Sequence, residues 1–329
     1  MFKVKGPFLM SGIIFSVVVL IGWAAEVQSQ EKYPTRAINV IVPFAPGGST
    51  DVAARINASF LSKKWGVPVN VINKPGGNTI PGQLEVYSSP PDGYTMLGDG
   101  LPMCSLLEVV VKDLPFRVMD RAFIAITSFS PQDIIVPATS SYKTLKDLME
   151  DAKKDPENFV WSSLGGVSGN DFGARMFFKA AGVDVGRTKP VMSKGGAQGA
   201  ALVAGGHIKM DVSTITTSLP HISAGTIRVL AVCFDKRDPL LPDVPTTAEL
   251  GYPSIYLPFW QGFSGPPKLP GHIVDIWTKA LQEMTKDKEY LGQLEKARLR
   301  LFYHSPREMI EYIKKEREVA EDVYGVKKK

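Results

Sequence analysis

The feature that most constrains the fold is a strand, a glycine turn, a helix and a second strand, in that order, near the start of the chain. Ala37–Pro43 is an apolar, β-branched run bounded by turn residues, which is typical of a strand buried on both faces. Gly47 and Gly48 interrupt this run, and apolar residues then recur at helical spacing over residues 52–61. A further β-branched run, Val67–Ile72, follows. This order predicts a βαβ unit and therefore a parallel sheet.

A second strand, glycine turn and helix follow about 120 residues later. Phe159–Ser162 is the strand, Leu164–Gly169 is the turn, and the helix ends at Gly182. Each unit directs the amides of a helix N-terminus out of the carboxyl end of a strand, where open α/β sheets bind ligands. The exposed N–H groups and the helix dipole favour an anion there. Two facing sites would hold a small dianion, or a carboxylate with a second polar end.

The remaining elements follow from periodicity and capping signals. Thr144 with Asp147, and Ser305 with Glu308, each have the spacing of a capping box at a helix start. The further predicted strands are Thr95–Leu97, Phe123–Phe129, Ile134–Pro137, Ile208–Ser213 and Arg228–Cys233. The further predicted helices are Leu145–Lys154, Ile273–Leu301 and Pro306–Val323.

The first glycine loop belongs to the stretch VPFAPGGSTD, Val42–Asp51. Gly47 and Gly48 let the backbone approach a ligand closely, and we expect the turn to need a positive φ at Gly48. Asp51 cannot face an anion, so we expect it to hold the loop by accepting hydrogen bonds from the loop amides. A tight turn without a ligand is the alternative. The loop has neither the Walker A pattern nor the G-x-G-x-x-G dinucleotide fingerprint.

The second glycine loop lies in WSSLGGVSGND, Trp161–Asp171, and bares the amides of Gly165 and Gly166. Ser168 fits equally well as a ligand contact or as the N-cap of the following helix. A third loop, Ser193–Ala197, carries Lys194, and a lone lysine is usually solvated.

Composition and motifs exclude several function classes. The 329 residues are 44% apolar and 22% charged, which indicates a soluble globular chain of about two domains. The net charge of +5 comes without a basic run, so nucleic-acid binding has no support. The sequence contains neither G-x-S-x-G nor H-E-x-x-H, and the four histidines lack metal-ligand spacing. We therefore expect no catalytic set, no metal and no cofactor.

Residues 1–29 have the pattern of a secretory signal peptide. Lys3 and Lys5 precede an apolar stretch, Gly12–Ala25, and small and polar residues follow it. The 14 residues of this stretch are fewer than the ~20 that a membrane-spanning helix needs. Cleavage after Ser29 is expected, and cleavage after Ala24 or Ala25 stays open. In an oxidising compartment the two cysteines, Cys104 and Cys233, could pair, and two buried free thiols are the alternative.

Six stretches in a joint order and spacing are similar to a known family. They are YPTRAINVIVPFAPGGSTD (Tyr33–Asp51), VINKPGG (Val71–Gly77), PDGYTML (Pro91–Leu97), KGGA (Lys194–Ala197), GGHIKMD (Gly205–Asp211) and LPDVPTTAELGYP (Leu241–Pro253). With them the mature chain resembles, along nearly its whole length, the Bug (TctC-type) solute-binding receptors of tripartite tricarboxylate transporters.

The resemblance implies a fold, a compartment and partners. The fold would be an α/β, two-domain periplasmic binding protein of type II, with Venus-flytrap closure and parallel-rich sheets covered by helices on both faces. Residues 30–125 and 235–329 would form domain 1 and residues 126–234 domain 2, with a hinge of crossing strands near Phe129 and Phe234. The protein would be a periplasmic monomer that delivers a small carboxylate to the membrane subunits of a tripartite tricarboxylate-type transporter.

The resemblance also implies the ligand-binding residues. Both glycine loops would hold the carboxylate, the Lys194 loop and Asp211 would line the side of domain 2, and Trp260 would close the cleft. The full set is Phe44, Ala45, Pro46, Gly47, Gly48, Ser49, Thr50, Asp51, Ser162, Ser163, Leu164, Gly165, Gly166, Val167, Ser168, Lys194, Gly195, Gly196, Ala197, Asp211 and Trp260.

Two departures from the family pattern bear on the ligand. Met192 and Ser193 stand where the family often has Pro-Tyr, and Leu101–Cys104 stands where it is usually small and polar. A less polar wall would favour an aromatic or branched carboxylate. The competing functions are a secreted hydrolase that uses the same cleft and a ligand-sensing receptor for a signalling partner.

Overall fold

The computed structural model describes residues 1–2 and 32–326. All but the first two residues of the predicted signal peptide lie outside this part. Residues from Arg36 onward form one compact unit and Met1–Thr35 form another, and only the first is considered below. Within the described residues, no helix combines the length and the apolar character that crossing a membrane requires.

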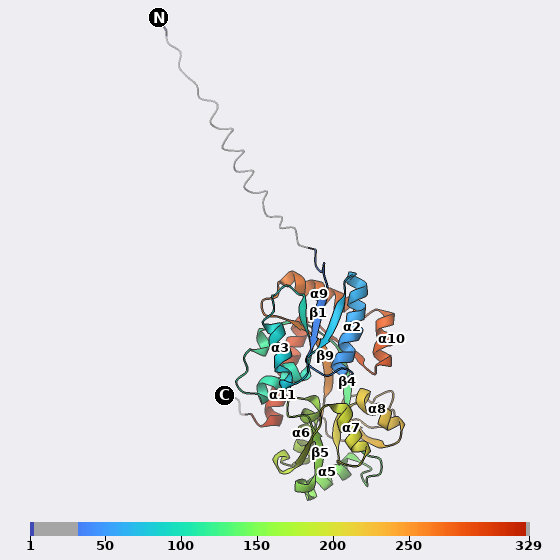
Figure 1. The fold of residues 1–329 in the computed structure, drawn as a ribbon. Coiled ribbons are helices and arrows are strands. Elements are labelled where there is room, and N and C mark those ends of the chain that lie inside the picture. Colours follow the sequence, from blue (N-terminus) through green and yellow to red (C-terminus); the bar gives the residue numbers. More distant parts are fainter. Residues whose placement is uncertain (3–31, 327–329) are drawn as a thin grey trace. The chain divides into compact units, whose positions relative to one another are not determined.

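The elements alternate between strands and helices along most of the unit (Figure 1). The strands are β1 (Ile38–Val42), β2 (Val69–Asn73), β3 (Thr95–Gly100), β4 (Ala122–Pro137), β5 (Val160–Ser163), β6 (Lys189–Met192), β7 (Asp211–Thr214), β8 (Ile227–Val232), β9 (Pro258–Gly265) and β10 (Arg300–His304). The helices are α2 (Ser49–Trp65), α3 (Ile80–Tyr87), α4 (Leu107–Val110), α5 (Leu145–Lys154), α6 (Gly169–Ala181), α7 (Gly196–Ala204), α8 (Ile215–Ser223), α9 (Gly271–Met284), α10 (Lys288–Lys296) and α11 (Pro306–Tyr324).

Both predicted strand–glycine turn–helix units are present. β1 pairs in parallel with β2 and with β3, so Val40 lies between Val71 and Met96. β5 pairs in parallel with β6, and a parallel bridge from Trp161 to Met210 links it to the start of β7. The other pairings among the described strands are antiparallel, within a sheet ordered β10-β4-β9-β3-β1-β2. The parallel strands are therefore those that the glycine loops follow.

A single long strand, β4, replaces the two strands predicted at Phe123–Phe129 and Ile134–Pro137. Its first half pairs with β9 and β10, and its second half pairs with β7 and β8. The intervening polar and proline residues suggested a break. In the structure Pro131 lies opposite Pro258, so the two residues without an amide hydrogen fall at the same point of the ladder.

The predicted helix over Ile273–Leu301 is interrupted after Met284, and its last residues are not helical. The structure has α9, then α10, then strand β10. The first helix ends at Met284, and Asp287 caps the second by accepting a hydrogen bond from the Tyr290 amide at 2.7 Å. Arg298 adopts a left-handed φ of 60° and turns the chain into β10. Apolar spacing continues through both breaks, which is why periodicity alone does not reveal them.

The two predicted capping boxes are confirmed. Thr144 accepts a hydrogen bond from the Asp147 amide, and the Asp147 carboxylate accepts one from the Thr144 amide. Ser305 and Glu308 make the same reciprocal pair at the start of α11. These helices begin where the sequence places them because the caps satisfy amides that have no partner within the helix.

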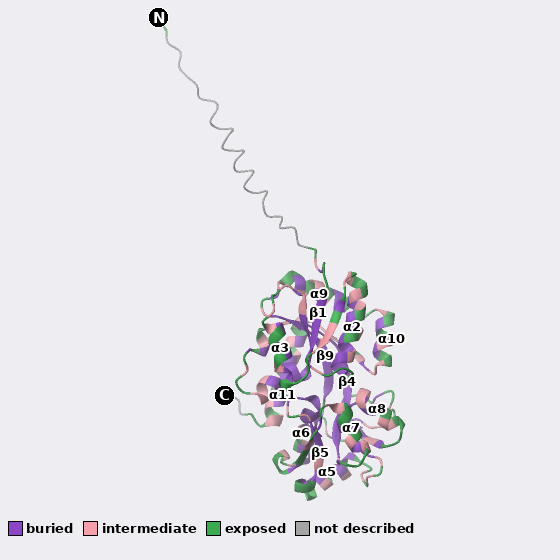
Figure 2. Cartoon of the chain, viewed as in Figure 1, coloured by how far each residue is buried: buried purple, intermediate pink, exposed green. Residues whose placement is uncertain are grey.

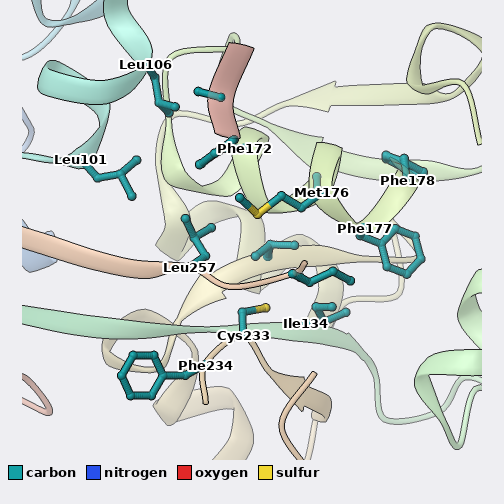
Figure 3. Packing of buried hydrophobic residues seen from close by; sticks show 14 of the residues in the cluster. Leu101, Leu106, Ile134, Phe172, Met176, Phe177, Phe178, Cys233, Phe234 and Leu257 are labelled. Atoms are coloured by element: carbon teal, nitrogen blue, oxygen red, sulfur yellow. The ribbon is translucent and has the colours of Figure 1, made fainter. Parts of the chain in front are cut away.

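The core runs through the strands, whereas the outer faces of the helices are exposed (Figure 2). In the largest cluster, Phe172, Phe177 and Phe178 of α6 pack with Ile134 and Leu257 (Figure 3). Cys104 and Cys233 are buried and unpaired, and burial raises the pKa of both thiols well above the usual value.

The apolar stretch Leu101–Cys104 packs inside the protein, with Leu101, Met103 and Cys104 fully buried. It therefore does not form the exposed, less polar cleft wall that the sequence suggested.

Aromatic rings gather where β4 changes its pairing partners. The Phe129 and Phe234 rings lie 4.7 Å apart, and the Phe302 ring of β10 lies 5.2 Å from Phe129. The two residues predicted to mark the hinge are therefore in contact with each other. The hinge itself and the domain boundaries at residues 125 and 234 stay predictions.

One ionisable contact joins α11 to β9. The Glu316 carboxylate accepts hydrogen bonds from Trp260 Nε1, at 2.9 Å, and from the Ser105 hydroxyl. Trp260 and Ser105 are both buried, so the carboxyl end of the side chain lies away from water. This desolvation raises the pKa of Glu316 to about 8.

We expect the melting temperature to fall as the pH rises from 5 to 8. In this window the folded chain holds a proton on Glu316 that the unfolded chain has lost, so higher pH favours unfolding. Glu316→Gln should make this dependence less steep in thermal melts at pH 5, 6, 7 and 8, and the buried carboxyl of Asp211 accounts for part of the remaining slope. Glu318→Gln, at an exposed position of the same helix, is the control. An unchanged slope in Glu316→Gln would contradict the assignment.

Candidate functional site

The first glycine loop leaves the carboxyl end of β1 and leads directly into α2. Gly47 has a left-handed φ of 85°, whereas Gly48 has an extended backbone with a φ of −73°. The expectation of a positive φ at Gly48 is therefore wrong by one residue. Gly48 is the N-cap of α2 and has no side chain to bond the helix amides. The first turn of α2 thus begins with donors that no capping side chain satisfies.

Asp51, the third residue of α2, holds this loop in place, as its charge predicted. Its Oδ2 accepts a hydrogen bond from the Gly47 amide at 2.9 Å, and its Oδ1 accepts one from Asn73 Nδ2 at 2.8 Å. Arg55 donates to Oδ2 at 3.1 Å. Burial raises the pKa of Asp51, but these bonds outweigh it and the pKa lies below its ordinary value.

Asn73 also holds the first loop, and the sequence did not single it out. It ends β2 and also donates to the Phe44 carbonyl at 3.1 Å. Phe44 itself is partly buried against Ile41, Leu97 and Met103. Asn73 could have been found from the sequence because it lies in the VINKPGG stretch, at the end of a strand that runs parallel to β1.

The second glycine loop repeats the same device. Asp171 is the third residue of α6, and its carboxylate accepts hydrogen bonds from the Leu164 amide at 2.8 Å and from Ser163 Oγ and Ser168 Oγ, both at 2.5 Å. Ser168 is the N-cap, and its hydroxyl accepts from the Asp171 amide at 3.0 Å. Asp171 was missed, although it follows its cap by the same three residues that separate Gly48 from Asp51.

These bonds decide which loop groups are available to a ligand. A serine hydroxyl has one proton, and Ser163 and Ser168 both donate theirs to Asp171. The Ser162 hydroxyl bonds that of Ser193 at 2.9 Å. Among the described residues, by contrast, the hydroxyls of Ser49 and Thr50 make no hydrogen bond. The first loop therefore offers hydroxyls and amides, while the second offers backbone amides.

Left-handed glycines shape the exposed part of the second loop. Gly165 and Gly166 have φ values of 97° and 100°. The Gly166 carbonyl accepts a hydrogen bond from the Tyr324 hydroxyl of α11 at 2.6 Å, which ties the loop to the C-terminal helix. Val167 is buried in the core, and Leu164 is half-buried. Met192, 64% exposed, lies beside the loop, with its Cε 3.6 Å from where a Cβ on Gly165 would stand.

The third loop leaves β6 at the same edge, because β5 and β6 are parallel with Ser163 opposite Met192. Lys194 and Ala197 are exposed, and Gly195 and Gly196 are half-buried. The Lys194 amide donates to Gln198 Oε1 at 2.7 Å. The third loop is thus held by a side chain of α7, the helix that follows it.

Asp211, at the start of β7, is fully buried. Its Oδ1 accepts a hydrogen bond from Asn170 Nδ2 at 3.3 Å, and its Oδ2 has no partner within the described part of the chain. Burial raises its pKa to about 8. A Cβ on Gly199 would collide with this carboxylate and with Ser162 Oγ, so only glycine lets α7 approach so closely.

Trp260 differs from its predicted place. Its side chain has no exposed surface, belongs to the hydrophobic core and donates its N–H to Glu316. The ring therefore has no free face with which to close a cleft. Trp260 is buried because it lies on β9, a strand that is buried along its full length.

The arrangement brings some predicted residues together and leaves others apart. The second loop, the third loop and Asp211 gather at the carboxyl ends of β5, β6 and the start of β7, while the first loop lies at β1. Within the described part of the chain, no hydrogen bond or ion pair joins the first loop to the second, and no three His, Cys, Asp or Glu side chains form a metal cluster. This chemistry suits the binding of an anion by amides and hydroxyls.

Comparisons with known proteins identify the family of the chain. Residues 53–323 match the tripartite tricarboxylate transporter family receptor. Protein BugT of Bordetella pertussis is 29% identical over 281 residues, which cover 84% of each chain. A solved periplasmic transporter superposes with a TM-score of 0.81 at 30% identity, covering 90% of this chain and 98% of that one. The R. palustris protein Rpa4515, solved with adipate, gives 0.82 at 25% identity, covering 89% and 98%.

We expect Ser168→Ala to lower the free energy of unfolding by about 1 kcal/mol, because it removes the N-cap of α6. Ser168→Gly should cost only a few tenths of a kcal/mol, since glycine is itself a tolerated N-cap. Urea melts of the two variants measure the difference. Equal stability of both variants and the wild type would mean that the cap contributes nothing.

Proposed function

The chain belongs to the tripartite tricarboxylate transporter receptor family, and we propose that it captures a small carboxylate between its two glycine loops for a transporter of that type. The fold is the two-domain α/β fold of periplasmic binding proteins. The family consists of periplasmic solute-binding receptors rather than enzymes, and we therefore reject the alternative that the chain is a secreted hydrolase.

The observation that carries this proposal is the pair of helix N-termini braced by Asp51 and Asp171. Each aspartate carboxylate is bonded to groups of its own loop, so the first-turn amides remain for an external anion, except the Asp171 amide that Ser168 already caps. The uncommitted hydroxyls of Ser49 and Thr50 add donors at the first loop. Asp211, with a raised pKa, adds little negative charge near neutral pH to the side of the second loop.

The ligand we propose is a small carboxylate with a second polar end. The relative solved with adipate supports this size and charge. Met192 would contact the aliphatic part, because it exposes an apolar side chain beside the second loop. The proposal also includes export by residues 1–29, delivery by a monomer to the transporter's membrane subunits, and two domains divided at residues 125 and 234.

A thermal-shift screen of residues 30–329 tests the proposed function. The panel holds adipate, L-malate, succinate, glutarate and benzoate. A ligand that binds only the folded chain raises its apparent stability by about 2.7 kcal/mol at a hundredfold excess over Kd. We expect at least one of these acids to raise the melting temperature. A melting temperature that none of the five acids raises would contradict the proposal.

Gly48→Val should abolish the response to that acid and leave the fold intact. The backbone at Gly48 suits any residue, and the nearest atom to an added Cβ is the Ala45 carbonyl oxygen at 3.7 Å. The valine would instead occupy space at the first turn of α2. Gly271→Val is the matched control, because Gly271 starts α9 with nothing within 4 Å of its added Cβ. If calorimetric titration gives Gly48→Val the wild-type affinity, the first loop is not the site.

A further inference from the structure

A buried amide on β4 has no partner. Gln132 has no exposed surface, and neither its Nε2 nor its Oε1 makes a hydrogen bond with any residue that the structure describes. The serines on the same face of the strand are paired: Ser128 Oγ lies 3.0 Å from Gln261 Oε1, and Ser130 Oγ lies 3.4 Å from Thr216 Oγ1. Asp133, the next residue and on the opposite face, is also buried, and its two carboxylate oxygens have no partner among the described residues. Because burying an unpaired amide is costly, such a group needs a specific explanation.

The position of Gln132 points to the site rather than away from it. A Cβ on Gly169, the first residue of α6, would stand 2.5 Å from Gln132 Nε2 and would also collide with the Phe259 ring. Only glycine therefore lets the start of α6 come so close to this side chain. The amide is thus directed at the helix N-terminus that the second glycine loop forms.

Gln132 also lies where β4 exchanges its partners. Pro131 pairs with Pro258 of β9, and Gln132 itself pairs with Thr214 of β7. A ligand at this point of the strand would contact the segment that the two halves of the sheet share.

We propose that Gln132 is a ligand-binding residue of this site and that the ligand is a carboxylate bearing a hydroxyl or an ammonium group. Nε2 donates to a carboxylate oxygen held at the N-terminus of α6, and Oε1 accepts from the hydroxyl or ammonium of the same molecule. A neutral amide cannot balance a charge, so Gln132 selects the ligand by hydrogen bonding. The inference rests on the proposed function and adds to it a contact residue and a ligand class.

The stability of the ligand-free protein tests the premise. Gln132→Leu removes two unpartnered polar groups and should leave the urea midpoint unchanged or raise it. Gln261→Leu is the matched control: its Nε2 donates to the Phe259 carbonyl at 2.8 Å and its Oε1 is paired with Ser128, so its loss should lower the midpoint. An equal fall in both variants overturns the inference, because Gln132 would then be satisfied without a ligand.

Calorimetric titration with L-malate and succinate, the same four-carbon diacid with and without a hydroxyl, tests the binding role. One neutral hydrogen bond corresponds to roughly 2- to 13-fold in affinity. We expect the wild type to prefer malate, and Gln132→Leu to lose about tenfold or more for malate, less for succinate, and most of the preference.

The outcomes separate the two proposals. If the wild type binds malate and Gln132→Leu binds it as tightly, the inference is overturned and the proposed function stands. A wild type that binds both acids equally, or neither acid while another carboxylate raises its melting temperature, overturns the ligand class. A wild type that binds no carboxylate of the panel contradicts the proposed function, and the inference falls with it.

Discussion

A carboxylate at the third residue of a helix, bonded to the loop before it, is the interaction on which both glycine loops depend. Gly47, Gly165 and Gly166 adopt left-handed backbones that an unrestrained chain would leave in many conformations. Asp51 and Asp171 fix them by accepting hydrogen bonds from loop amides and hydroxyls. Each carboxylate also lies at the positive end of its helix, where negative charge is favoured. The loops are therefore preorganised by carboxylates whose oxygens are bonded to groups of their own loops.

Both loops are held by an aspartate, but they differ in the hydrogen-bonding groups that remain available to a ligand. A glycine caps α2, so its first turn stays open, whereas Ser168 caps α6 and is bonded to Asp171 in both directions. An anion at the first loop would meet hydroxyls and amides, and one at the second would meet amides alone. A ligand with two unlike ends fits this difference better than a symmetric one.

The sequence predicted the parts that local chemistry determines. The role of Asp51, the capping boxes at Thr144 and Ser305 and the parallel order around β1 all follow from neighbours in the chain. Features that depend on distant partners could not be predicted. Pro131 lies within a continuous strand opposite Pro258, a residue 127 positions away, and Trp260 is buried together with the rest of strand β9. The choice between a capping and a ligand-binding role for Ser168 depended on Asp171, which ends the WSSLGGVSGND stretch but was not singled out.

An unpaired amide at Gln132 also bears on how ligand binding and conformation are coupled. A ligand shifts a conformational equilibrium only by as much as its affinities for the two states differ. Gln132 supplies such a difference, because an arrangement that keeps it buried and unpaired is penalised without a ligand and relieved with one. Since β4 joins both halves of the sheet, that relief acts on the strand about which two domains would move. The hydrogen bonds between Gln132 and the ligand would then both select the ligand and favour closure of the domains around it.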